Sequence, residues 1–400
     1  MNLSKLLSII LIALIFTIAA GCSGKADVSD KEIDAMAKYV DDNGNILDES
    51  GKIVNSDKKM GKTTVGFLFV GGFDDFGYNQ AAYLGSMAVE KAFPDVNVIR
   101  AENVPETAEV ETKMEEMIKS GAKIIFATSY GYLPQVLTVA KKYPDVIFYH
   151  QGGLESADNV GTYFASIWKE MYLSGVSAGK MTKSNKLGFV ASVPIEQVLL
   201  NLNAFTMGAR SVNPDATTTA VFTNSWCDPV TQVSVTNDMA GKGIDVISQH
   251  QDCTKTIVET AEKLNLYVVG YHADASSIGK NNWVTGGIWD WGNAYIELVQ
   301  TALDGKFKTS PYHSVYQFPD NFGAAKLASF GPKVPSDVKQ LVEDLEPDII
   351  TGKIHPFTGP LKDNQGNIQI PAGTTVSDDD IMNSSTYLVE GVIGNIPKTD

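Results

Sequence analysis

The sequence predicts an α/β protein built from two doubly wound lobes that are joined by a hinge. Three observations support this prediction. The chain has 400 residues, which is enough for two domains of ordinary size. Helix and strand patterns alternate along most of the chain, as is typical of parallel sheets, and they do so in two consecutive series. We therefore expect lobe 1 at residues 63–166 and lobe 2 at residues 167–288, with residues 289–400 returning to lobe 1 and ending in a tail with a hairpin.

The first 22 residues have the pattern of a secretion signal. One early cation, Lys5, precedes an almost unbroken apolar run at residues 6–20. The run ends in the letters AAGC, which resemble the end of a bacterial lipoprotein signal that is cleaved before a lipid-modified cysteine, here Cys22. We expect the folded part to lie outside the cytoplasm, anchored to the cell membrane by lipid. An uncleaved anchor or a secreted protein with a free cysteine remain alternatives.

Residues 23–62 are polar, charged and poor in large apolar residues, which predicts a tether between the anchor and the folded part. Turn signals flank two short apolar pairs and are compatible with a small hairpin. The acidic run DDNGNILDESG invites a calcium-site interpretation. Its spacing lacks the glycine and the terminal glutamate of an EF-hand loop, so solvated turns are the better interpretation.

The opening strand of lobe 1 is expected at residues 65–70, a continuous apolar run of the kind that is buried on both faces of a parallel sheet. Asp74, Tyr78 and Asn79 follow at its carboxyl end, where open α/β sheets bind ligands. The glycines form no phosphate-binding motif, and two carboxylates would repel a phosphate, so a stacked ring is the better ligand. Further elements are expected as helices at 80–93, 107–120 and 133–142 and strands at 96–100, 123–128 and 146–150.

Lobe 2 shows the same alternation. Strands are expected at 187–191, 218–222, 246–249 and 266–271, and helices at 168–181, 197–212, 229–242 and 254–264. A strand at 284–288 and a helix at 291–303 then lead back toward lobe 1. The tail contains the stretch PFTGPLKDNQGNIQIPAG, whose turn residues at 363–366 predict a hairpin.

The charge of the chain excludes one class of partner. Its formal net charge is −15, and Arg100 and Arg210 are its two arginines. The chain therefore lacks both the basic surface and the forked donors that polyphosphate recognition uses. Nucleic acid is not an expected partner.

Several motifs together resemble the basic membrane protein family of ABC-transporter substrate-binding lipoproteins. They are GGFDDFGYNQAAYLG, FASIWKEMYLSGVSAG, NAFTMGARSVNP and GPLKDNQG, spread over about residues 64–394. The resemblance implies a type I periplasmic-binding-protein fold, a monomer that works with an ABC permease, and a purine nucleoside as ligand. It implies neither catalysis nor a cofactor.

The resemblance also implies site residues. The family's base-stacking phenylalanine and its neighbouring asparagine correspond to Tyr78 and Asn79, and tyrosine keeps the stacking face. The acidic residue of that loop corresponds to Asp74 or Asp75. The ligand-contacting loop after the third strand, and the aromatic residue of lobe 2, correspond to Ser129, Tyr130 and Trp226. Tyr78 and Trp226 could instead be ordinary core or hinge residues.

The chain departs from the family where nucleoside-binding members hold ribose. Gly270 to Asp274 read G-Y-H-A-D, so that His272 replaces the first carboxylate while Asp274 keeps the second. Trp289 or Asp290 stands where a lysine is expected. A more aromatic, less charged pocket could suit a free purine base, or another flat heterocycle, better than a nucleoside. The expected ligand-binding residues are Asp74, Tyr78, Asn79, Ser129, Tyr130, Trp226, His250, Gln251, Asp252, His272, Asp274 and Trp289.

Two other classes of protein remain as alternatives. The residue types at 250–253, 272 and 274 can bind zinc, but no H-x-x-x-H or C-x-x-C spacing holds them, so we expect no metal. A ligand-binding sensor lipoprotein for a flat heterocycle such as a flavin is the second alternative.

The two remaining cysteines, Cys227 and Cys253, follow predicted strand ends in lobe 2. In a 2-1-3-4 strand order these strands flank the first strand, which puts the two loops roughly 10 Å apart. A disulfide needs α-carbons within about 7 Å. We therefore favour two reduced thiols over a bridge.

Overall fold

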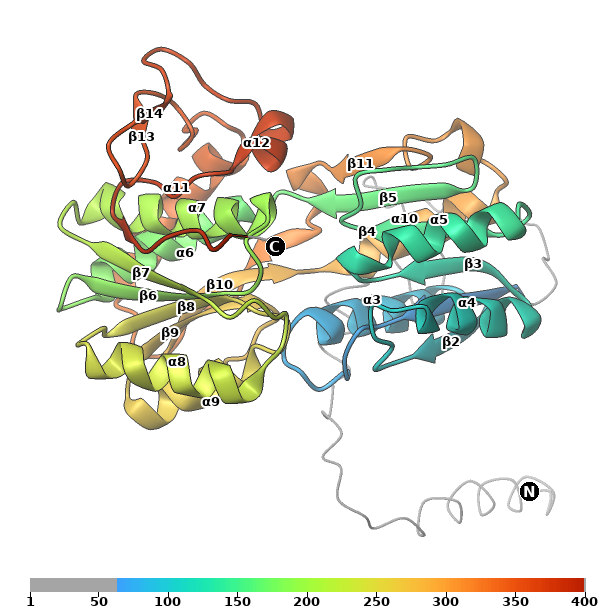
Figure 1. Cartoon of the computed structure of the whole chain (residues 1–400), viewed down its shortest axis with the longest axis horizontal. Helices are drawn as coiled ribbons and strands as arrows, with labels where there is room; N and C mark the ends of the chain where they lie inside the picture. The colour runs from blue at the N-terminus through green and yellow to red at the C-terminus, as the bar shows by residue number, and fades with distance from the viewer. Residues whose placement is uncertain (1–62, 399–400) are drawn as a thin grey trace, which may run out of the picture.

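The computed structural model describes residues 63–398, which form two α/β lobes side by side (Figure 1). The predicted secretion signal, Cys22 and the predicted tether with its possible hairpin lie outside the described residues. Each lobe is built on a mainly parallel sheet with helices on both faces, which confirms the predicted fold class. Within residues 63–398, no helix combines the length and the apolar character needed to cross a bilayer.

Lobe 1 contains a six-stranded parallel sheet with the order β11-β5-β4-β3-β1-β2. Its strands are β1 (Thr64–Leu68), β2 (Asn97–Ala101), β3 (Ala122–Ala127), β4 (Ile147–Gln151), β5 (Val160–Ala165) and β11 (Val315–Phe318). Helices α3 (Tyr78–Ala92) and α10 (Trp291–Leu303) cover one face, and α4 (Glu109–Lys119) and α5 (Leu133–Lys142) cover the other. Two short 3₁₀ helices, η1 (Tyr130–Tyr132) and η2 (Phe307–Thr309), lie between these elements.

Lobe 2 contains a seven-stranded sheet with the order β12-β10-β9-β8-β6-β7-β15, in which only β12 is antiparallel to its neighbour. Its strands are β6 (Lys186–Ala191), β7 (Thr217–Phe222), β8 (Val246–His250), β9 (Tyr267–His272), β10 (Trp283–Trp289), β12 (Ala325–Leu327) and β15 (Val392–Ile393). Helices α6 (Trp168–Met181) and α7 (Glu196–Val212) pack on one face, and α8 (Pro229–Gly241) and α9 (Lys255–Leu264) on the other.

The path of the chain after residue 288 corrects the prediction. The chain returns to lobe 1 for α10 and β11, as expected, but then crosses back through the 3₁₀ helix η3 (Asp320–Phe322) to β12 in lobe 2. The tail packs on lobe 2, where α11 (Ser336–Ile350) lies on α6 and α12 (Asp378–Ser384) lies on α7 (Figure 1). The hairpin β13 (Leu361–Lys362) and β14 (Ile368–Ile370) belongs to this tail.

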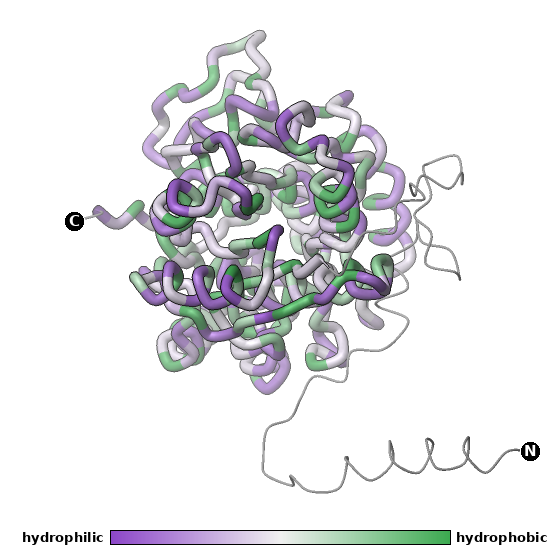
Figure 2. The backbone as a smooth tube through the Cα atoms, turned by 90° about the vertical axis from the view of Figure 1, so that its right-hand side faces the viewer, coloured by the Kyte–Doolittle hydropathy of each residue, from purple (hydrophilic) through white to green (hydrophobic). Residues whose placement is uncertain are grey.

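The core follows from the apolar pattern of the strands. In β1, Val65 and Phe67 are fully buried against the α3 and α10 side, and Leu68 is fully buried against the α4 and α5 side. Successive side chains of a strand point to opposite faces, so a strand covered on both faces must be apolar throughout. Figure 2 shows hydrophobic and hydrophilic residues mixed along the chain, as expected where helices bury one face and expose the other.

Candidate functional site

A small pocket lies between the lobes, at loops that follow the carboxyl ends of strands from both sheets. We call it the inner pocket. It is lined by Tyr78, Ser129, Tyr130, Gln151, Gly152, Phe164, Gln197, Trp226, His250, Asp252 and His272. Its free volume is about 20 Å³, enough for about one water molecule. The lobes are thus closed on each other, and a ligand can enter the pocket only when they separate.

A larger outer cleft adjoins the inner pocket and shares Tyr130, Gly152, Phe164 and Gln197 with it. Its volume is about 570 Å³. Helix α12 of the tail forms part of one wall through Asp379, Met382 and Asn383. The lining contains the carboxylates of Glu196 and Asp379 and no lysine or arginine.

The lobe 1 wall of the inner pocket is held by one carboxylate. Asp75 accepts hydrogen bonds from the backbone N–H groups of Gly77, Asn79 and Gln80 at 2.9–3.0 Å, at the start of α3. These groups have no partner within the helix, so the carboxylate satisfies them. Burial raises the pKa of Asp75 to about 6, against the hydrogen bonds, which lower it. Tyr78 is placed at the pocket by this first turn.

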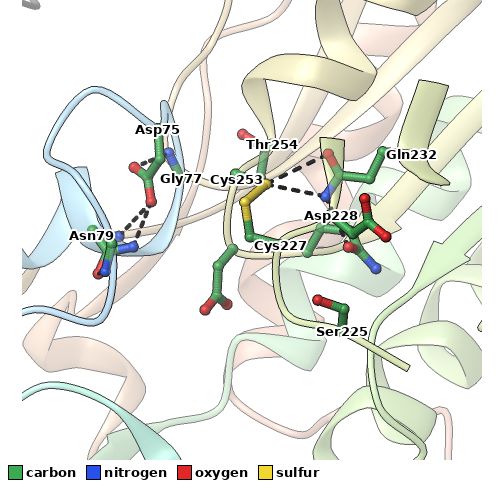
Figure 3. Close-up of a disulfide and its surroundings, with 12 residues drawn as sticks. Asp75, Gly77, Asn79, Ser225, Cys227, Asp228, Gln232, Cys253 and Thr254 are labelled. Carbon is green, nitrogen blue, oxygen red and sulfur yellow. Dashed lines mark hydrogen bonds between the residues drawn. A yellow bond between two sulfur atoms is a disulfide. The ribbon is translucent and has the colours of Figure 1, made fainter. Parts of the chain in front are cut away.

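The lobe 2 wall is held by a disulfide between Cys227 and Cys253, which is drawn in Figure 3. Our prediction of two reduced thiols is therefore wrong. Strands β7 and β8 do flank β6, as predicted, but the loops beyond them lean together over β6. The Cα–Cα distance is 5.3 Å, and the backbone N–H of Asp252 donates to the carbonyl of Trp226 at 2.8 Å. The bridge joins the two loops that carry Trp226 and Asp252.

The two walls touch each other directly. The backbone N–H of Tyr78 donates to the carbonyl of Asp252, and that of Lys255 donates to the carbonyl of Asp75, both at 3.1 Å. The hydroxyl of Thr254 donates to the carbonyl of Phe76. A Cβ atom at Gly77 would lie 1.8 Å from the carbonyl oxygen of Asp252, so only glycine allows this approach.

Two histidines of the inner pocket have one ring nitrogen already engaged. The indole N–H of Trp289 donates to Nδ1 of His272 at 2.9 Å, and the amide of Asn201 lies 3.1 Å from Nδ1 of His250. Burial lowers the pKa of His250 to about 3, and burial together with His250 lowers the pKa of His272 well below its usual value. Both rings are therefore neutral at physiological pH.

The polar groups of the pocket have spare hydrogen-bonding capacity. Nε2 of His272 and Nε2 of Gln151 are buried and have no partner among the described residues. The amide oxygen of Gln151 is contacted by the hydroxyls of Tyr163 and Tyr295, both at 3.1 Å. Burial, with the nearby charges of Asp75 and Glu106, raises the pKa of Asp252 well above its usual value. Buried groups of this kind normally have partners, so these atoms are available for further hydrogen bonds.

The structure brings together seven of the twelve predicted site residues: Tyr78, Ser129, Tyr130, Trp226, His250, Asp252 and His272. Three of the other five have side chains that are engaged elsewhere and do not line the pocket. Asn79 bonds Gly71 and Asp75, Gln251 bonds Gln232 and Thr223, and Asp274 accepts from the backbone of Ser276.

The remaining two do not line the inner pocket either. Asp74 is exposed and does not line the pocket, because the neighbouring Asp75 is the residue that turns inward to cap α3. Trp289 is fully buried behind His272, stacked on Trp291 with a centroid distance of 4.7 Å. It contacts two residues that line the pocket, His272 and Phe164.

Sequence reasoning missed four lining residues. Gln151 and Gly152 directly follow the predicted fourth strand, so the strand-end rule applied to the other loops would have found them. Phe164 lies on β5, a strand that was not predicted. Gln197 lies in the first turn of α7 and carries no distinctive local pattern. Within residues 63–398, no group of three or more His, Cys, Asp or Glu side chains is arranged to hold a metal ion.

Two doubly wound lobes that enclose a pocket at the carboxyl ends of their strands define a solute-binding protein of the type I periplasmic-binding-protein fold. The sequence narrows this class further. The family described as ABC transporter substrate-binding protein, PnrA-like, matches residues 62–315, and the chain belongs to it. Its members bind small molecules for ABC permeases.

Individual relatives agree with this family. A purine-binding protein of Brucella abortus is 34% identical over 338 residues, which cover 84% of this chain and 95% of the relative. A putative ABC transporter glucose-binding protein of Haloferax volcanii is 28% identical over 331 residues, covering 83% and 80%. The crystal structure of an ABC transporter solute-binding protein from Aeropyrum pernix superposes with a TM-score of 0.61 at 19% identity, covering 73% of this chain and 92% of that one. This last similarity concerns the fold.

Proposed function

We propose that this protein is a lipoprotein, anchored through Cys22 outside the cytoplasm, that binds a purine base or nucleoside between its lobes and delivers it to an ABC permease. The observation that carries the proposal is the inner pocket, in which one aromatic ring from each lobe meets a set of buried hydrogen-bonding groups. The purine-binding relative supports the choice of solute.

A purine suits the chemistry of the inner pocket. Its flat ring can stack between Tyr78 and Trp226, and its edge carries both donors and acceptors. His272 and Gln151 have free polar atoms for that edge, and Asp252 adds a carboxyl group. A protonated carboxyl offers one donor and one acceptor side by side, which complements the neighbouring acceptor and donor of a purine edge.

The outer cleft limits which substituents a bound purine can carry. A neutral substituent such as the sugar of a nucleoside fits a volume of about 570 Å³. A phosphate does not suit this cleft, because the lining has two carboxylates and no lysine or arginine to offset the phosphate charge. We therefore expect bases and nucleosides to bind and nucleotides to be rejected.

Calorimetry tests the proposal with adenine, guanine, hypoxanthine, their nucleosides and their monophosphates, on the mature chain and on Tyr78→Ala and Trp226→Ala. Each ring should contribute about 1–3 kcal/mol of binding free energy. Tyr143→Ala, which removes a half-buried tyrosine outside the pocket, is the control. Undiminished binding by both variants would show that the purine does not lie between these rings.

The same panel should include riboflavin, because another flat heterocycle is the main alternative solute. Binding of riboflavin with no binding of purines would replace the proposed solute while leaving the stacked site in place. Loss of binding in Tyr78→Ala would then still locate the ligand.

A further inference from the structure

We propose that Trp289 locks His272 in a single tautomer, so that His272 presents a permanent N–H donor to an acceptor atom of the ligand. The proposal rests on the proposed function for the identity of the ligand. Trp289 is accordingly a positioning residue that acts through His272, and His272 determines specificity by requiring an acceptor at one position of the ligand.

The tautomer follows from the hydrogen bond behind the ring. The indole Nε1 of Trp289 is a donor only, and it lies 2.9 Å from Nδ1 of His272. Nδ1 must therefore accept, which means that it carries no proton. A neutral imidazole holds its one proton on the other nitrogen, so Nε2 is the N–H donor.

That donor faces the pocket and is not used by the protein. Nε2 of His272 has no hydrogen-bond partner among the described residues, and His272 is 2% exposed. The nearest acidic oxygen, Oδ1 of Asp252, is 3.7 Å away, which is too far for a hydrogen bond. A buried donor left without a partner is costly, and a ligand acceptor placed there removes that cost.

Two features agree with a fixed position for His272. Its φ angle is 72°, in the left-handed region that residues other than glycine rarely adopt, and such residues concentrate at ligand sites. His250, which also lines the pocket, likewise has Nδ1 engaged, by the amide of Asn201 at 3.1 Å.

Two tryptophans provide a matched pair of variants. Trp289→Phe removes the N–H donor and keeps an aromatic ring in the stack with Trp291 and Phe164. Trp291→Phe makes the same change in the same stack, but the indole N–H of Trp291 has no partner among the described residues. Trp291→Phe is therefore the control for packing. His272→Asn removes the Nε2 donor while keeping a residue type that tolerates the left-handed conformation.

The first experiment is NMR of the histidine ring nitrogens in the mature chain, which distinguishes the two neutral tautomers. We expect His272 to be protonated on Nε2 in the parent and in Trp291→Phe, and to become a mixture of tautomers in Trp289→Phe. A proton on Nδ1 in the parent, or an unchanged tautomer in Trp289→Phe, would overturn the proposal. This result does not depend on the ligand.

The second experiment compares adenine and hypoxanthine with deaza analogues, in which one ring nitrogen is replaced by C–H. The analogue that lacks the acceptor facing His272 should bind the parent about tenfold to a hundredfold more weakly. This difference in affinity between purine and analogue should shrink at least about threefold in Trp289→Phe, disappear in His272→Asn and persist in Trp291→Phe. An equal difference in the parent and all three variants would refute the proposed role of Trp289 in fixing the tautomer of His272. If no purine binds at all, the proposed function fails, while the NMR result still decides the tautomer.

Discussion

The two walls of the inner pocket come from different positions in their sheets and are held by different chemistry. The lobe 1 wall follows β1, whose counterpart in lobe 2 is β6, whereas the lobe 2 wall follows the neighbouring strand β7. Each consists of a loop between a strand and a helix that brings one aromatic ring to the pocket. The lobe 1 loop, between β1 and α3, depends on hydrogen bonds to the single carboxylate of Asp75. The lobe 2 loop, between β7 and α8, is tied by a disulfide to the loop after β8.

Because of this difference, the two walls should respond to different solution conditions. A carboxylate titrates, so the lobe 1 wall should respond to pH, whereas a disulfide does not titrate and responds to reductants. The lobe 2 wall, which the disulfide holds, also supplies the carbonyl of Asp252 that accepts the hydrogen bond from the backbone N–H of Tyr78 in the lobe 1 wall. We infer that lobe 2 provides the rigid surface and that lobe 1 closes against it.

The largest expected effect comes from removing the disulfide. Cys227 and Cys253 are 26 residues apart, and a bridge that closes a loop of this length stabilises a protein by about 3 kcal/mol. The double variant Cys227→Ser, Cys253→Ser should lose about this much free energy of unfolding, as measured by denaturant titration of the mature chain. Ser225→Ala, in the same loop, is the control.

Thiol counting gives an independent check of the bridge. In the denatured, unreduced chain lacking residues 1–22, neither Cys227 nor Cys253 should react with a thiol reagent, and both should react after reduction. Two reactive thiols before reduction would contradict the disulfide and remove the proposed difference between the walls.

The second effect concerns the contact between the walls. Gly77→Ala places a methyl group against the carbonyl of Asp252, so the lobes can no longer approach fully. Because closure completes the site, we expect ligand affinity to fall at least about tenfold, and small-angle scattering to show a more open particle. Gly241→Ala, where the added methyl group meets nothing within 4 Å, is the control and should behave like the parent. Unchanged affinity in Gly77→Ala would mean that this approach is not needed for binding.

The smallest expected effect is the pH response of the lobe 1 wall. Burial raises the pKa of Asp75 from 3.8 to about 6, so the folded state retains a proton that the unfolded state has released. Stability should therefore fall as pH rises from about 4 to 6, by at most about 1.4 kcal/mol per pH unit. Asp75→Asn should make this slope shallower, and the double cysteine variant should leave it unchanged. The slope does not vanish, because burial also raises the pKa values of Asp252 and Glu170, which contribute with the same sign. Denaturant unfolding at about pH 4, 5 and 6 measures the slope in each variant. An unchanged slope in Asp75→Asn would assign the response to those other groups.

Some features of this protein were determined by the sequence alone. Local patterns predict two such elements. A strand is expected at residues 65–70 and is observed as Thr64–Leu68, and a helix is expected and observed at Leu133–Lys142. Both are predictable because periodicity and turn residues act within a few positions of the chain. Seven pocket residues were predictable because the ligand loops of an α/β sheet follow its strands, and because the motifs resemble those of a known family. These signals are all local, or are inherited with a local motif.

Other features were decided only by the tertiary structure. The sequence shows that Cys227 and Cys253 follow strand ends, but only the packing of their loops over β6 brings the α-carbons to 5.3 Å. Asp74 and Asp75 are neighbours, and the start of α3 decides which of them turns inward. Trp289 was expected at the ligand and lies behind His272 instead. In each case the outcome depends on groups far apart in the chain, whose distance is set by how whole elements pack and leaves no trace in the local pattern of residues.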